Sequence, residues 1–293
     1  QYILSWGWGM TTSGGNKFCW LTWPQKFVKA KARTTNPLKK VVCLDPNRRG
    51  TGPHADEWYA NRPGSDVAFF LGLANHLVNN TATGFANGLI DETYLVKHTN
   101  APFLIGADGK ALVVSGKEQV WDKTSSSAKA FDATGVVPVL LPGKKTIGGK
   151  TYQTGFELYK AHLKTYTPSW ADTQCKIPAG TVKKIAAEMF TAAKIGTFIT
   201  IDGKKLPYRP VSMMAYHVSQ QETGFQAIRA ALMVYQLLGA IDVPGGIQVD
   251  FGPSALYKNW PKLNAVSIKT SNLPFTLAGS KFFPINSGCP SFF

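Results

Sequence analysis

The chain has 293 residues and is 44% hydrophobic, which is enough to bury the core of one large or two ordinary domains and excludes a disordered chain. Its net charge of +15 would suit nucleic acid, but the lysines are spread over many segments without a nucleic-acid-binding motif, so no nucleic acid is expected as a partner. No apolar run reaches the ~18 residues of a membrane-spanning helix. The four cysteines are scattered and form no Cys-x-x-Cys pair, so they give no signature of a zinc or iron–sulfur site.

The first predicted element is a strand at residues 1–6, which ends in a turn with Gly7 and Gly9. Polar residues follow, Thr12 among them, and then a predicted helix at about residues 17–33. A Gly-x-Gly pair alone is weak support for a nucleotide site, but its position between a strand and a helix strengthens that interpretation.

A second strand is predicted at residues 41–45 by a short apolar run that is rich in β-branched side chains. It ends at Asp45, because Pro46 cannot extend a central strand and pushes the residue before it towards an extended conformation. An acidic side chain at the carboxyl end of a parallel strand lies where open α/β sheets bind ligands.

A turn at residues 62–66 contains Gly64 and precedes a predicted helix at 66–80, with Ser65 or Asp66 as its cap. Two acids, a glycine turn and a helix N-terminus would then meet in one crevice. That arrangement suits a nucleotide, because carboxylates accept hydrogen bonds from ribose or guanine and backbone N–H groups bind phosphate. An ordinary turn and N-cap would give the same spacing, so the residues alone leave both interpretations open.

The rest of the chain alternates irregular and regular segments. Residues 106–155 predict β-hairpins or an irregular excursion. Helices are predicted at 156–163, 181–190 and 226–238, and a strand is predicted at 195–202.

Three phrases follow one another near the second strand: Asp45-Pro46-Asn47-Arg48, Ala55-Asp56 and Arg62-Pro63-Gly64-Ser65-Asp66. Together they resemble the molybdopterin oxidoreductase family, the enzymes related to dimethyl sulfoxide reductase. Their order and spacing match the family pattern, which usually has Arg where this chain has Asn47 and Thr where it has Ser65. The resemblance spans roughly residues 1–250, and its phrasing is nearest to the polysulfide, thiosulfate and tetrathionate reductases.

The resemblance implies an α/β fold with doubly wound parallel-sheet dinucleotide-binding domains. Residues 1–194 would form a molybdopterin guanine dinucleotide-binding domain, with the excursion at 106–155 inside it. Residues 195–252 would belong to a second α/β cofactor-binding domain, and residues 253–293 would form an extended arm.

The implied cofactor is bis-molybdopterin guanine dinucleotide (bis-MGD) with molybdenum or tungsten, used for two-electron redox of a small compound such as a sulfur compound. Asp66 would accept from the guanine N1–H and N2–H groups, and Asp45 would contact ribose or guanine. The other cofactor-binding residues that the resemblance implies are Gly7, Gly9 and Thr12 at the pyrophosphate, Pro46, Arg48 and Gly64 in the two turns, and Ser219, Gln220 and Thr223 at the pterin or a phosphate.

The catalytic metal ligand has no counterpart in this sequence, so we expect the chain to be the central segment of a longer catalytic subunit. The remainder of that subunit would be its first partner. A [4Fe-4S] cluster is expected in a preceding part or in an iron–sulfur electron-transfer subunit, and a membrane anchor subunit would be an optional third partner. Family members are often exported in folded form with their metal bound, so the resemblance implies that this protein lies in the periplasm or cell envelope.

Two rival interpretations remain open at this point. A nicotinamide- or flavin-dependent dehydrogenase would have an acid about 20 residues after the glycine turn, but Asp45 lies nearly twice as far along. A non-catalytic basic scaffold or electron-transfer partner would keep a vestigial nucleotide-binding fold without the metal.

Overall fold

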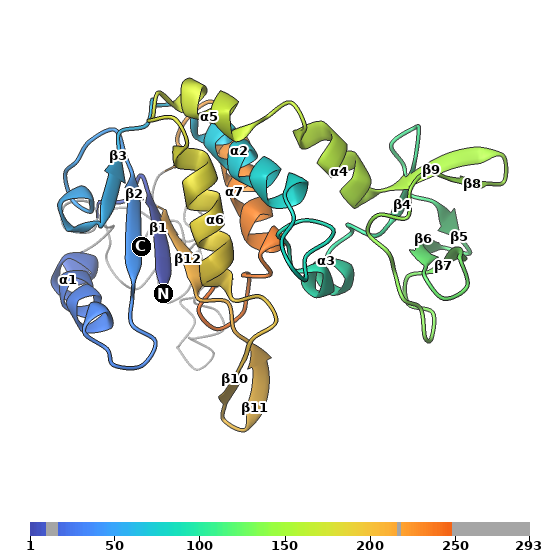
Figure 1. Ribbon diagram of the computed structural model, residues 1–293, viewed down its shortest axis with the longest axis horizontal. Coiled ribbons are helices and arrows are strands. Elements are labelled where there is room, and N and C mark those ends of the chain that lie inside the picture. Colours follow the sequence, from blue (N-terminus) through green and yellow to red (C-terminus); the bar gives the residue numbers. More distant parts are fainter. Residues whose placement is uncertain (10–16, 216–217, 248–293) are drawn as a thin grey trace, which may run out of the picture. The chain divides into compact units, whose positions relative to one another are not determined.

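The computed structural model describes residues 1–9, 17–215 and 218–247 (Figure 1). Residues 1–247 form one compact unit. No helix among the described residues is long and apolar enough to cross a membrane.

A four-stranded parallel sheet organises this unit. Its strands are β1 (Tyr2–Trp6), β2 (Lys40–Leu44), β3 (Glu57–Tyr59) and β12 (Val211–Ala215), in the order β12-β1-β2-β3. The α/β class with a parallel sheet is therefore confirmed, and both predicted N-terminal strands are present. Because every strand runs in the same direction, all four carboxyl ends lie along one edge of the sheet.

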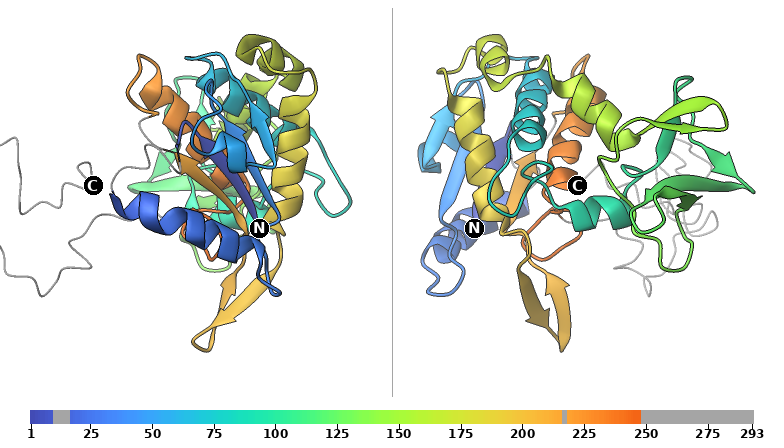
Figure 2. Two further views of the ribbon diagram at one scale, coloured as in Figure 1. Left: turned by 90° about the vertical axis from the view of Figure 1, so that its left-hand side faces the viewer. Right: turned by 45° about the vertical axis from the view of Figure 1, so that its right-hand side comes forward.

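Helices cover both faces of the sheet. Helices α2 (Asp66–Asn79), α6 (Thr181–Ala193) and α7 (Gly224–Leu237) lie on one face, where Leu4 of β1 joins their core. Helix α1 (Lys17–Lys31) lies on the other side of the sheet from α6 (Figure 2).

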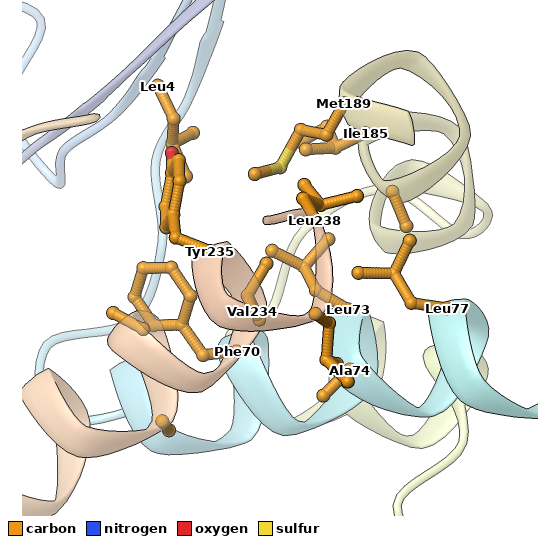
Figure 3. Close-up of a cluster of buried hydrophobic side chains, with 14 of the residues drawn as sticks. Leu4, Phe70, Leu73, Ala74, Leu77, Ile185, Met189, Val234, Tyr235 and Leu238 are labelled. Atoms are coloured by element: carbon orange, nitrogen blue, oxygen red, sulfur yellow. The ribbon is translucent and has the colours of Figure 1, made fainter. Parts of the chain in front are cut away.

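Apolar side chains from three helices and the sheet form a continuous core (Figure 3). Tyr235 of α7 lies against Leu4, and Leu73 of α2 lies between α7 and the Ile185–Met189 side of α6. Gly72 lets α2 approach Ala171 and Val182 closely, because a Cβ there would lie 2.5 Å from the Cβ of Ala171 and 3.0 Å from Cγ1 of Val182. The core fixes the start of α2 and the start of α7 relative to the sheet.

The remaining elements are shorter. They are a 3₁₀ turn (Gly52–His54), α3 (Glu92–His98), β4 (Leu104–Gly106), β5 (Val113–Val114), β6 (Lys117–Asp122), β7 (Ser127–Ala130), β8 (Lys145–Ile147), β9 (Lys150–Thr154), α4 (Gly155–Leu163), α5 (Pro168–Cys175), β10 (Phe198–Ile201) and β11 (Lys204–Pro207). Strands β4 to β9 form two small antiparallel sheets, so the predicted hairpin excursion is present.

The strand predicted at 195–202 exists, but it does not enter the parallel sheet. As β10, it forms an antiparallel hairpin with β11. Asp202 and Gly203 both have positive φ, at 49° and 75°, which is the backbone of a type I′ turn. The strand that enters the sheet is β12, after the hairpin.

Glu57 lies between two lysines at the amino edge of the sheet. Its Oε1 is 2.8 Å from Nζ of Lys40 and 2.5 Å from Nζ of Lys184, and its Oε2 accepts from the Tyr59 hydroxyl at 2.8 Å. Burial opposes ionisation of this carboxyl, but the hydrogen bonds from Lys184, Lys40 and Tyr59 outweigh it and lower the pKa of Glu57 to about 2.

This cluster predicts a specific loss of stability in acid. Because the folded pKa of Glu57 lies below its ordinary value of 4.5, the carboxylate stabilises the fold above pH 4.5, and the contribution is lost as pH falls towards 2. Urea unfolding of the wild type and Glu57→Gln should show a constant stability difference above pH 5 that shrinks towards zero in stronger acid. A difference that does not vary with pH would contradict this account.

Candidate functional site

Asp66 occupies the centre of the carboxyl edge of the sheet. It is the first residue of α2 and is only 7% exposed. Its Oδ1 accepts hydrogen bonds from Trp6 Nε1 at 2.7 Å and Asn61 Nδ2 at 3.4 Å, and its Oδ2 accepts from Gln221 Nε2 at 2.8 Å. One buried carboxylate therefore connects the end of β1, the segment after β3 and the loop before α7.

The turn before α2 is held by its own backbone and by α5. The N–H of Arg62 donates to the carbonyl of Cys175 at 2.8 Å, and Gly64 has φ +80°. Ser65 is at the N-cap position, but its hydroxyl donates to the Arg62 carbonyl at 2.6 Å. Ser65 is therefore the N-cap residue, as one of the two predicted alternatives, but its side chain makes no capping hydrogen bond to the helix.

Asn61 is almost completely buried beside Asp66, at 4% exposure. Its Oδ1 is a buried acceptor with no hydrogen-bond partner among the described residues. The orientation of the amide follows from its neighbour, because the carboxylate oxygen of Asp66 can face only the donor end of the amide. An unpaired buried acceptor is costly, so this oxygen marks a position where a donor is needed.

Asp45 lies in the next loop along the same edge. Its Oδ1 accepts from the N–H of Asn47 at 2.8 Å, and its carbonyl accepts from Trp58 Nε1 at 2.9 Å. Burial raises the pKa of Asp45, and the hydrogen bond from Asn47 opposes that rise. Pro46 is exposed, and the Arg48 guanidinium lies 5.8 Å from the centre of the Trp58 ring.

The turn after β1 reaches the same edge. Gly7 has φ +59°, and its N–H donates to the carbonyl of Leu44 at 3.1 Å. The carbonyl of Trp8 accepts from the Thr51 hydroxyl, which ties this turn to the loop after β2. Gly9 is buried. Thr12, which we expected at the pyrophosphate, lies outside the described residues.

The loop before α7 contributes a residue that the sequence did not single out. Ser219, Gln220 and Thr223 are exposed, and Thr223 precedes α7 without a side-chain capping bond. Gln221 is the residue that reaches Asp66. The structure therefore brings Asp66, the Gly7 turn and this loop to one edge of the sheet. The side chains of Trp6, Asn61 and Gln221 connect them by hydrogen bonds to Asp66.

The loop is tightly wound around Gly224, which gives a prediction for its backbone. A Cβ at Gly224 would lie 2.2 Å from the carbonyl oxygen of Ser219. Gly224→Ala should therefore displace the loop, weaken the Gln221–Asp66 bond and lower stability by about 1–3 kcal/mol in urea unfolding. Gly64→Ala is the matched control, since no atom lies within 4 Å of its Cβ position and only its positive φ opposes the substitution. A larger loss for Gly64→Ala would contradict the crowding argument.

Among the described residues, no group of three or more His, Cys, Asp or Glu side chains could hold a metal ion. The carboxyl edge presents hydrogen-bond acceptors, the carboxylate of Asp66 and the amide oxygen of Asn61. It suits recognition of a ligand that carries several N–H or O–H donors.

No protein-family model matches the chain, but individual proteins do. A sulfite dehydrogenase subunit from Allochromatium vinosum is 27% identical over 75% of this chain and 26% of its own length. The major subunit of formate dehydrogenase-O from Escherichia coli is 24% identical over 80% of this chain and 21% of its own length. Trimethylamine-N-oxide reductase from Haemophilus influenzae is 22% identical over 83% of this chain and 21% of its own length.

Among solved structures, acetylene hydratase from Pelobacter acetylenicus matches with a TM-score of 0.48 and 19% identity, over 84% of this chain and 22% of its own. The chain spans about a quarter of the length of the curated relatives it matches.

Proposed function

Because this chain belongs to the molybdopterin oxidoreductase family, we propose that it is part of a molybdenum or tungsten catalytic subunit, in which it holds a guanine dinucleotide arm of bis-MGD. The observation that carries the proposal is the buried carboxylate of Asp66 at the carboxyl edge of the parallel sheet. Ligands of open α/β sheets bind at this edge, and a carboxylate makes strong, charge-assisted hydrogen bonds to N–H donors.

The residues present fit a guanine nucleotide. Asp66 accepts three hydrogen bonds within the chain, and a carboxylate offers about four acceptor positions, so one remains for a ligand. The unpaired oxygen of Asn61 adds a second acceptor beside it. Guanine presents adjacent N1–H and N2–H donors, which complement such a pair.

The sugar and phosphates would lie along the neighbouring turns. Asp45 would accept from ribose hydroxyls. Gly7 and Gly9 would let the backbone of their turn approach the pyrophosphate closely, and the uncapped first turn of α2 would offer it backbone N–H groups. Gly9, Gly64 and the exposed Ser219 would complete the contacts on either side.

The bound metal would supply the two-electron redox chemistry, and the role of this chain is to bind and orient the cofactor. A sulfur compound is the proposed substrate, supported by the likeness to a subunit of sulfite dehydrogenase and by the phrasing of the sequence. On the same grounds we propose a location in the periplasm, an iron–sulfur electron-transfer subunit and a membrane anchor subunit.

Elemental and nucleotide analysis of the purified complex tests the proposal. Molybdenum or tungsten should be present, and denaturation should release guanine nucleotide in proportion to the metal. A complex with neither would contradict the proposal and favour the non-catalytic scaffold. Nicotinamide or flavin in place of guanine would favour a dehydrogenase of another class.

A further inference from the structure

Asn61 carries a buried side-chain oxygen that packing alone does not explain. Asn61 follows β3, and its backbone N–H donates to the Tyr59 carbonyl at 3.1 Å. Its side chain is therefore fixed at the carboxyl edge of the sheet, next to the first residue of the 14-residue helix α2. Leucine or isoleucine would fill the same volume without burying an unpaired oxygen, so the amide needs another explanation.

We infer that Asn61 is a specificity-determining residue of the nucleotide site, whose Oδ1 accepts a hydrogen bond from the exocyclic 2-amino group of a guanine base. The inference rests on the proposed function and deepens it. Asp66 fixes the amide so that Nδ2 faces the carboxylate and Oδ1 faces away from it. The edge then presents two kinds of acceptor, a carboxylate and a neutral amide oxygen.

Two acceptors at the same edge of the sheet select among the bases. Adenine and cytosine each offer one amino group beside a ring nitrogen that accepts, and that nitrogen would face an acceptor here. Guanine offers N1–H to the carboxylate of Asp66 and its 2-amino group to the oxygen of Asn61. Hypoxanthine keeps N1–H and lacks the amino group, so it isolates the contribution of Asn61.

The alternative occupant of this position is a buried water molecule that donates to Oδ1. A water would satisfy the oxygen in every ligand state and would give no preference between guanine and hypoxanthine. The two occupants are therefore distinguished by binding measurements.

The test compares guanosine diphosphate and inosine diphosphate by calorimetry on the full chain and on Asn61→Leu. The wild type should bind guanosine diphosphate about tenfold more tightly, which is the value of one buried hydrogen bond. Asn61→Leu should lose that preference by weakening guanosine diphosphate alone. The melting temperature of Asn61→Leu should equal or exceed that of the wild type, because an unpaired buried acceptor is removed.

Asn75→Leu provides the matched control. Asn75 is also buried, but its Nδ2 donates to the Leu163 carbonyl at 2.6 Å, away from the carboxyl edge. This variant should melt at a lower temperature and keep the preference for guanosine diphosphate.

Equal binding of the two nucleotides by the wild type, or an unchanged preference in Asn61→Leu, would overturn the role of Asn61 and leave the proposed function standing. Failure of the wild type to bind either nucleotide would overturn the proposed function as well.

Discussion

Arg209→Ala is expected to lower the free energy of unfolding by about 3–5 kcal/mol, among the largest effects of any single substitution in this chain. The Arg209 guanidinium donates through Nε at 3.0 Å and Nη2 at 2.6 Å to Oδ2 of Asp91. The two side chains are only 5% and 6% exposed. Removing the arginine would leave the Asp91 carboxylate buried without its counter-charge.

The pair also connects three parts of the fold, which adds to the cost. Asp91 caps α3 by accepting from the N–H of Tyr94 at 3.0 Å. Arg209 Nη1 donates to the carbonyls of Thr197 and Tyr208, which bracket the β10–β11 hairpin. Gly239, after α7, leaves room for the carboxylate, since a Cβ there would lie 2.5 Å from Oδ2 of Asp91.

Urea unfolding monitored by circular dichroism measures the effect. Lys117→Ala is the matched control, because the Lys117–Asp132 pair has 53% and 41% exposed side chains and should contribute less than about 1 kcal/mol. The double variant Asp91→Ala with Arg209→Ala should be less unstable than the sum of its single variants, since neither charge is left unpaired. Additive losses would show that the two residues act independently.

Local signals predicted the framework of the site. The apolar run ending at Asp45 and Pro46 predicted β2 and the position of the acid at its end, and Gly64 predicted the turn before α2. These features depend on residues close together in the sequence, where strand and turn preferences act.

Contacts between residues far apart in the sequence could not be predicted in the same way. Trp6 and Asp66 are 60 residues apart, and Gln221 is 155 residues from Asp66, so no local pattern joins them. A buried indole N–H needs an acceptor, which is the one hint that Trp6 carried.

The strand predicted at residues 195–202 is present, but it pairs with β11 and not with the parallel sheet, and a local signal for that hairpin was present in the sequence. The Asp202-Gly203 pair is a strong hairpin signal between two strands. Strand β12, which does pair with β1, follows Arg209 and Pro210 and gave a weaker local signal. Its place in the sheet depends on tertiary packing against α7, where the Tyr235 hydroxyl donates to the Ser212 carbonyl at 3.1 Å.

Asp66→Leu is expected to abolish guanine nucleotide binding and to destabilise the fold. Leucine would leave the buried donors of Trp6, Asn61 and Gln221 without their acceptor. Each buried donor left unpaired costs about 1–3 kcal/mol, so a loss of about 3 kcal/mol or more is expected in urea unfolding. Because such a variant could lose binding through misfolding alone, a conservative substitution is needed.

Asp66→Asn provides that substitution. The amide oxygen can still accept from the Trp6 indole, and an NH₂ donor replaces the other carboxylate oxygen. Affinity for guanosine diphosphate should fall about 100-fold, since a charge-assisted acceptor is lost. Affinity for xanthosine diphosphate should rise, because xanthine has a carbonyl at the 2-position, where guanine has the amino group that faces Asn61. The amide of Asn61 is then no longer oriented by a carboxylate and can turn its own donor towards that carbonyl. A misfolded variant would bind neither nucleotide. A change of preference from guanosine to xanthosine diphosphate would therefore show that Asp66 contacts the base. Loss of both affinities with a native melting curve would show that Asp66 only supports the surrounding structure.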